Sequence, residues 1–129
     1  SRYLTFILTD LDLTPISFLY IELLSNDYDK VWSVCSDKKK RGEGNSSIVL
    51  NNAIKDYKKS KRNGLLLEVY NDKTIDRDEN DPLQSHIINH FQKHGFKKRD
   101  REKLEFNTLN NLLSRDGETQ VMIFDKIDF

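Results

Sequence analysis

The first 24 residues hold two apolar segments separated by a short polar stretch, and this pattern constrains the fold more than any other. Residues 3–9 alternate apolar and polar side chains, which is the period of a strand with one buried face. Residues 16–24 are apolar nearly all round, and Thr14 and Pro15 before them could also begin a helix. Because the segment is rich in aromatic and β-branched residues, a strand is favoured. We therefore predict a β-hairpin that turns at residues 10–15.

The rest of the chain is expected to alternate between helices and strands. Further strands are predicted over residues 30–36, 65–70 and 119–124. About three helices are predicted, beginning at Ser46 or Ser47, at Pro82 and at Asp100, and ending near Lys61, Gly95 and Leu113. No linker or repeat divides the chain. The expected fold class is therefore α+β with a largely antiparallel sheet, in a single domain over residues 1–129.

Composition narrows the class of protein. The 129 residues are 36% apolar and 33% charged, as in one polar globular domain. Lys and Arg number 21, as do Asp and Glu, which disfavours a dedicated nucleic-acid module. Cys35 is the only cysteine, so a disulfide framework is excluded and a reducing compartment is favoured. With no signal peptide and no long apolar run, we expect a soluble intracellular protein.

One stretch carries a candidate chemistry. Residues 7–14 read Ile-Leu-Thr-Asp-Leu-Asp-Leu-Thr, an apolar strand followed by Asp-x-Asp-x-Thr. This resembles the first motif of haloacid-dehalogenase-type phosphatases, which implies Asp10 as nucleophile, Asp12 as proton shuttle and a bound Mg²⁺. The same resemblance implies that Asp125 and Asp128 hold the metal, with Ser36 and Lys73 as further phosphate contacts.

The favoured interpretation of this stretch is a polar hairpin turn. There Asp10 and Asp12 would accept hydrogen bonds from nearby backbone N–H groups. Few residues separate Asp12 from the next strand, which leaves little room for the flap that follows the nucleophile in the phosphatases. The capless phosphatase is therefore kept as the alternative function.

The other candidate sites are interpreted as structural. His86, His90 and His94 lie four apart and could share a metal, but a row at a helix boundary is favoured. Two basic patches, Lys38–Arg41 and Lys58–Arg62, are expected to be a solvated loop and a helix end, with phosphate contact as the alternative. No Gly-rich phosphate loop of the P-loop or Rossmann kind is present, so no cofactor is predicted.

Three stretches resemble the N-terminal domain of the Sld-seven (MTBP-like) family of DNA replication initiation factors. They are Leu4–Thr9, Ile21–Asn26, and Tyr57–Lys61 followed by Asn63–Val69 and Asp72-Lys73. Trp32 has a plausible counterpart between the last two. The resemblance implies a small barrel-like sheet with helices and a non-catalytic, nuclear subunit that binds an Sld-three-like replication factor.

A physical feature also favours protein binding. The strand over residues 16–24 is apolar on both faces, so that one face needs cover beyond the domain's own sheet. Helices of the same chain could supply that cover, and a partner protein is the other possibility. The candidate protein-binding residues are Phe18, Tyr20, Ile21, Leu23 and Trp32. The leading hypothesis is therefore a protein-binding adaptor, and no enzyme.

Overall fold

The computed structural model describes residues 2–23, 28–40, 42–62, 64–73, 81–100 and 119–125. Their strands form one open, largely antiparallel sheet in the order β1-β2-β3-β4-β6-β5. Because β1 and β5 are two separate edges, the sheet is not the barrel that the family resemblance implied. The chain divides by its contacts into two compact units, which meet in sequence at residues 65 and 66. The single domain stays a prediction.

The first unit begins with the expected hairpin. Strand β1 (Arg2–Thr9) pairs antiparallel with β2 (Pro15–Leu23), and β2 pairs antiparallel with β3 (Tyr28–Ser36). The helix alternative for residues 16–24 is therefore wrong. Strand β2 lies between two strands and is no edge. Tyr20 is opposite Ser33 and Ile21 is opposite Val31, so β3 carries one extra residue, Trp32, in a bulge.

The turn between β1 and β2 is the polar turn that the sequence favoured. The Asp10 Oδ1 atom accepts hydrogen bonds from the backbone N–H groups of Asp12 and Thr14, each at 2.9 Å. Leu13 adopts a φ of 64°, an uncommon left-handed conformation for a leucine. The turn thus uses the Asp10 carboxylate to hold the backbone.

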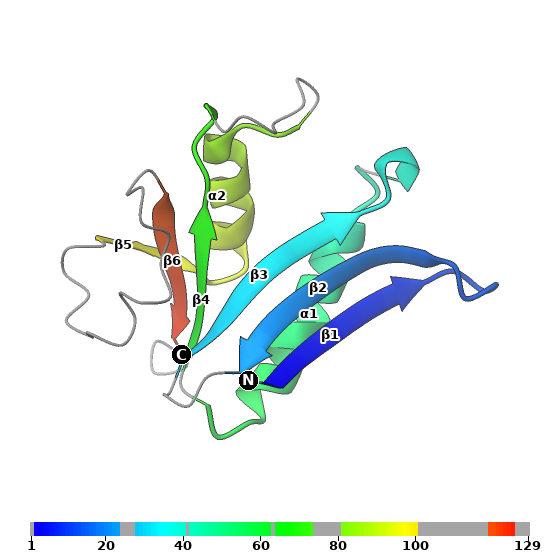
Figure 1. The fold of residues 1–129 in the computed structure, drawn as a ribbon, viewed down its shortest axis with the longest axis horizontal. Helices are drawn as coiled ribbons and strands as arrows, with labels where there is room; N and C mark the ends of the chain where they lie inside the picture. The colour runs from blue at the N-terminus through cyan, green and yellow to red at the C-terminus, as the bar shows by residue number, and fades with distance from the viewer. Residues whose placement is uncertain are drawn as a thin grey trace. The chain divides into compact units, whose positions relative to one another are not determined.

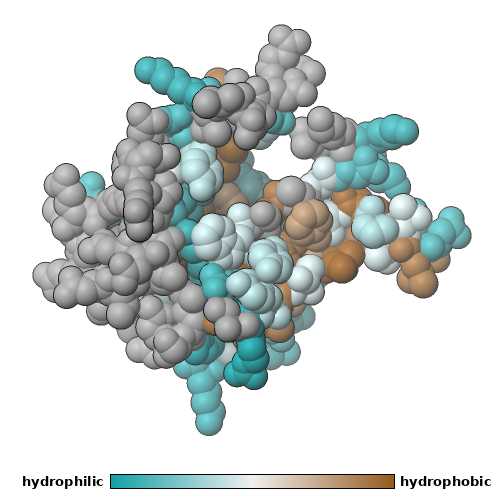
Figure 2. Space-filling model, in the orientation of Figure 1, coloured by the Kyte–Doolittle hydropathy of each residue, from teal (hydrophilic) through white to brown (hydrophobic). Residues whose placement is uncertain are grey.

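Helix α1 (Asn45–Lys58) covers one face of the three strands (Figure 1). Its apolar stripe recurs at helical spacing and is buried: Val49, Leu50, Ala53, Ile54 and Tyr57. From β2, the side chains of Leu19 and Ile21 lie in the same core. Phe18 and Trp32 are substantially exposed, at 39% and 47%, and Figure 2 shows apolar side chains gathered over β1–β3.

A buried cluster follows the end of α1. The Asp29 carboxylate, fully buried near the start of β3, accepts hydrogen bonds from Arg62 Nε at 3.1 Å and from Arg62 Nη2 at 2.5 Å. The Tyr57 hydroxyl donates to the carbonyl oxygen of Gly64. Burial raises the pKa of Tyr57, and the Asp29 carboxylate raises it further. These contacts tie the end of α1 and the segment that follows it to the start of β3.

The second unit contains most of β4 (Gly64–Val69), with α2 (Gln84–Lys93), β5 (Lys97–Arg99) and β6 (Gln120–Asp125). Strands β5 and β6 pair antiparallel. Phe96 contacts Phe91 edge to face and Phe124 at a tilt, with ring centroids 5.4 and 5.6 Å apart. Strand β5 was not predicted, because its three residues are all basic and show no alternation.

The helix predictions are confirmed in part. Helices α1 and α2 are both present, and the third expected helix lies outside the described residues apart from Asp100. In α2 the buried side chains are Ile88 and Phe91, whereas Leu83, at the N-cap, is half exposed. Among the described helices, none has the length and apolarity needed to cross a membrane.

Candidate anion-binding site

The loop between β3 and α1 carries the most distinctive backbone geometry of the first unit. After β3 ends at Ser36, a short 3-10 turn covers Lys38–Lys40, and α1 begins at Asn45. The Asp37 carboxylate accepts a hydrogen bond from the N–H of Lys39 at 3.1 Å, and the Asn45 side chain donates to the carbonyl oxygen of Lys40 at 3.2 Å. Side-chain hydrogen bonds therefore hold the backbone at both ends of the loop.

Two glycines shape the second half of this loop. Gly42 and Gly44 have φ values of 85° and 78°, in the left-handed region that glycine adopts without strain. A Cβ atom built on either one would meet nothing within 4 Å. The glycines are thus needed for the turn of the backbone, and the surface above them is open to a ligand.

Gly44 is also the N-cap of α1. It supplies no side-chain cap, and the hydrogen bond from the N–H of Ile48 to the Gly44 carbonyl oxygen, at 3.2 Å, closes the first turn. The N–H groups before Ile48 have no carbonyl one turn back in the helix, and the helix dipole places partial positive charge there. No acidic residue occupies that first turn.

The charges around the loop are mixed, with a cationic majority. Lys39 is exposed and Lys40 half-buried, and both belong to the 3-10 turn that precedes the glycines. Glu43 lies between the two glycines, with its Oε2 atom 3.5 Å from the Asn45 side-chain nitrogen. A helix N-terminus preceded by a glycine turn and lysines has the elements of a phosphate-binding site.

This site was missed in the sequence. Residues 38–44 were interpreted as a solvated basic loop, and Ser46 or Ser47 as the helix cap. The available signal was the Gly42-x-Gly44 pair placed directly between a strand and a helix. It does not match the P-loop or Rossmann spacing, and a glycine in the left-handed region is an unusual N-cap, since serine is usually preferred.

The predicted phosphatase residues do not form a catalytic group in the described residues. Asp10 is committed to the turn, and the Ser36 hydroxyl lies 2.9 Å from that of Ser17. Lys73 lies in a turn, where its backbone N–H donates to the Asn71 side chain. Asp125 ends β6, and Asp128 lies outside the described residues. No group of three or more potential metal ligands occurs in the described ranges.

The histidines line one side of α2. The ring centroids of His90 and His94 are 5.0 Å apart, and the buried Nε2 atom of His90 has no hydrogen-bond partner among the described residues. Burial lowers the pKa of His90, and the neighbouring charges of His94, His86 and Lys93 lower it further. Burial also lowers the pKa of His94. Burial therefore favours the neutral form of both imidazoles.

The candidate protein-binding residues are separated by the fold. Ile21 is in the core, with 2% of its surface exposed, while Tyr20 and Leu23 are half-buried. On the outer face, Trp32 donates its indole N–H to Glu22 at 2.9 Å, and the Lys30 ammonium lies 3.8 Å from the Trp32 ring centroid. Binding of a protein by this face stays a prediction.

Several solved structures with a similar fold are acetyltransferases. A GNAT-family acetyltransferase from Staphylococcus aureus matches 96% of this chain and 68% of its own, with a TM-score of 0.70 and 14% identity. The ribosomal-protein-S18-alanine N-acetyltransferase of Escherichia coli matches 95% of this chain and 67% of its own, with a TM-score of 0.63 and 19% identity. The chain has the GNAT fold.

A third similar structure contains coenzyme A. The PaiA N-acetyltransferase of Thermoplasma acidophilum, in complex with coenzyme A, matches 90% of this chain and 57% of its own, with a TM-score of 0.60 and 16% identity. No protein-family model and no curated protein sequence matches the chain. At these low sequence identities, the similarity concerns the fold alone.

These matches overturn the functional hypotheses drawn from the sequence. The resemblance to Sld-seven is wrong, because the similar structures are GNAT acetyltransferases and none points to a replication factor. The non-catalytic adaptor, its Sld-three-like partner and the haloacid-dehalogenase phosphatase are contradicted by the same finding. The short stretches behind the resemblance fall largely on β1, the end of β2, the end of α1 and β4, which are local elements common to many folds. The nuclear location stays a prediction.

Proposed function

We propose that the protein is an N-acyltransferase that takes its acyl group from an acyl-coenzyme A. The observation that carries the proposal is the loop at residues 37–44, where two left-handed glycines open onto the start of α1. The GNAT fold supports it, because proteins of this fold include acetyltransferases solved with coenzyme A. Coenzyme A carries an anionic pyrophosphate, and this loop is suited to hold it.

The residues present fit a pyrophosphate. The open space above Gly42 and Gly44 lets phosphate oxygens approach the backbone closely, which a Cβ atom would hinder. The first N–H groups of α1 would donate to those oxygens, and the positive end of the helix dipole favours their charge. Lys39 and Lys40 add positive charge beside the same loop.

The loop would bind the acyl-coenzyme A donor and orient it. When bound, an acyl-coenzyme A supplies a thioester carbonyl that a primary amine can attack, with departure of the thiolate. The side chains of Asp37 and Asn45 hold the loop in place before any ligand arrives, which reduces the ordering needed on binding. Anchoring one end of a flexible donor in this way contributes to the rate by proximity.

Calorimetric binding of coenzyme A and acetyl-coenzyme A tests the proposal, with Gly44→Ala as the principal variant. Alanine in the left-handed region costs roughly 1 kcal/mol, and its methyl group would occupy the open space above the loop. We expect the affinity to fall about tenfold, equivalent to about 1.4 kcal/mol. The matched control is Gly95→Ala, a glycine with φ 94° after α2, which should lower stability and leave the affinity unchanged.

Charge variants test the same site independently. Replacing Lys39 and Lys40 by alanine should weaken binding and reduce its dependence on salt. The control pair, Lys58→Ala with Lys59→Ala, lies at the other end of α1 and should have little effect. Glu43→Gln removes the negative charge between the glycines, so binding should tighten.

Activity is measured as thiol released from acetyl-coenzyme A in the presence of primary amines. The expected result is amine-dependent release that Gly44→Ala reduces through the apparent affinity for the donor. If coenzyme A does not bind at low ionic strength, or if Gly44→Ala and Gly95→Ala bind it equally well, the proposal is wrong.

A further inference from the structure

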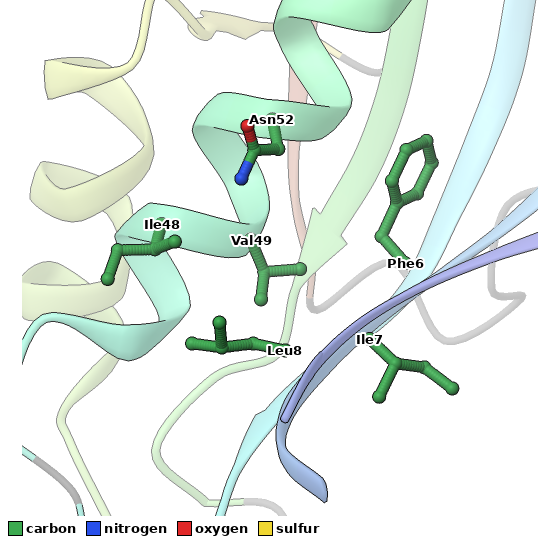
Figure 3. A pocket seen from close by; sticks show the side chains of 6 residues that line it. All are labelled: Phe6, Ile7, Leu8, Ile48, Val49 and Asn52. Atoms are coloured by element: carbon green, nitrogen blue, oxygen red, sulfur yellow. The ribbon is translucent and has the colours of Figure 1, made fainter. Parts of the chain in front are cut away.

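The groove between β1 and α1 offers a specific ligand little to hold. It has a volume of about 190 Å³ and is lined by Phe6, Ile7, Leu8, Ile48, Val49 and Asn52. Figure 3 shows Asn52 as the polar side chain beside five apolar ones. Because several converging polar groups usually fix the orientation of a small ligand, this groove is less informative than the histidines of α2.

The histidines of this chain are concentrated on one helix. The sequence contains three of them, His86, His90 and His94, at intervals of four residues. His86 and His90 lie within α2, and His94 is its C-cap residue. Residues four apart lie on the same face of a helix, so neighbouring members of this row are close in space.

We infer that His90 and His94 together bind one transition-metal ion of the Zn²⁺, Ni²⁺ or Cu²⁺ class, with water completing its coordination. Imidazole nitrogen is a preferred ligand of these ions. No group of three or more potential ligands occurs in the described part of the chain, so the protein would supply two. The inference does not depend on the acyltransferase proposal.

The spacing of the two rings fits a shared ion. At metal–nitrogen distances of about 2.0–2.1 Å, two imidazoles bound to one tetrahedral or octahedral ion have ring centroids roughly 4.5–5.5 Å apart. The centroids of His90 and His94 are 5.0 Å apart. The backbone at the end of α2 thus already places both rings at the separation that an ion requires.

The orientation of the rings can adjust without moving the helix. Their planes meet at 68°, in an edge-to-face arrangement. The χ2 torsion of a histidine is soft, and the Cβ–Cγ bond points toward the ring centre. Rotation about this bond therefore turns the ring nitrogens while the centroids stay in place, and each ring can present a nitrogen to the same ion.

A buried nitrogen without a partner also points to a ligand. The Nε2 atom of His90 is buried and has no hydrogen-bond partner among the residues that the structure describes. Such an atom costs free energy and calls for a water molecule or an ion. Metal binding after a ring rotation would remove this cost, and it would break no printed hydrogen bond of the His90 ring.

The protonation state favours binding, and one nearby charge opposes it. Burial lowers the pKa of His90 and that of His94, so at neutral pH the ion need displace no proton from either ring. The positive charges that act on His90 are those of His94, His86 and Lys93. Lys93 is exposed, so water and salt screen its repulsion of the ion.

Calorimetric titration of the whole chain, prepared without a histidine tag and stripped of metal, tests the inference. We expect one Ni²⁺ or Zn²⁺ ion per chain and tighter binding of Cu²⁺. Mg²⁺ should not bind at the same concentration, because it prefers oxygen ligands. Ni²⁺ should also raise the melting temperature, since an ion held only by the folded helix stabilises that state.

Single substitutions identify the ligands. His90→Asn and His94→Asn should each weaken Ni²⁺ binding by at least the roughly tenfold that loss of an outer-shell partner costs. His86→Asn is the matched control, because His86 is exposed on the same face one turn before His90, and its affinity should be unchanged. Lys93→Gln should tighten binding at low salt.

A spectroscopic measurement counts the ligands directly. The paramagnetic resonance spectrum of bound Cu²⁺ should show two imidazole nitrogens in the wild type and one in His94→Asn. Should His90→Asn not fold, His94→Asn at the C-cap keeps both the titration and the spectrum decisive.

Three results would overturn the inference. If millimolar Ni²⁺ neither binds nor shifts the melting temperature, the two rings do not form a site. If His94→Asn binds Ni²⁺ as tightly as the wild type, the ion lies elsewhere. If His86→Asn loses as much affinity as His94→Asn, the ligands are not the pair named.

Discussion

Replacement of Arg62 by methionine is the sharpest test of what holds the first unit together. The Arg62 guanidinium makes two hydrogen bonds to the Asp29 carboxylate, which is 0% exposed, while the guanidinium is 32% exposed. Removal of one partner of a buried ion pair is strongly destabilising and costs about 3–5 kcal/mol. Because a domain is stable by about 5–15 kcal/mol, the variant should lose a large fraction of its stability.

The assay is chemical denaturation followed by circular dichroism, with thermal melting beside it. We expect a fall in the free energy of unfolding of about 3 kcal/mol or more, with a melting temperature lower by roughly 10–20 °C. Lys61→Met is the control. Lys61 is an exposed neighbour in the sequence, so its loss should change stability by less than about 0.5 kcal/mol.

A double-mutant cycle shows whether the pair is responsible. Asp29→Asn combined with Arg62→Met also removes the buried charge that faced the guanidinium, so the double variant should be more stable than Arg62→Met alone. If Arg62→Met is as stable as Lys61→Met, or if the double variant loses the sum of the two single losses, the reasoning about the buried carboxylate is refuted.

Two further predictions concern the hairpin turn and α2. Asp10→Ala should lower the free energy of unfolding by about 1 kcal/mol through the loss of its two hydrogen bonds, whereas Asp12→Ala should have little effect, as denaturation will show. The depressed pKa of His90 means that the unfolded chain binds its proton more readily, so stability should fall as the pH is lowered below the ordinary histidine value of about 6.5. In His90→Gln this part of the loss should disappear, and a melting temperature whose pH dependence is unchanged would contradict it.

The sequence by itself determined the local elements. Alternation in residues 3–9 and the aromatic, β-branched run after Pro15 specify the strands of the hairpin, because a period of two matches the extended backbone whatever the rest of the chain does. The Asp10 turn was predicted for the same reason, since its hydrogen bonds reach only to Asp12 and Thr14. The apolar stripe of α1 likewise depends on spacing within one helix.

The tertiary structure alone decided the sheet order and the candidate site. Strand order is a set of pairings between distant segments, and the short stretches that suggested a barrel and a replication factor contain no information about it. The role of Gly42 and Gly44 depends on where the strand before them and the helix after them lie, because only that geometry turns a basic loop toward the open start of α1. The buried pairing of Arg62 with Asp29, 33 residues apart, was also decided by the fold.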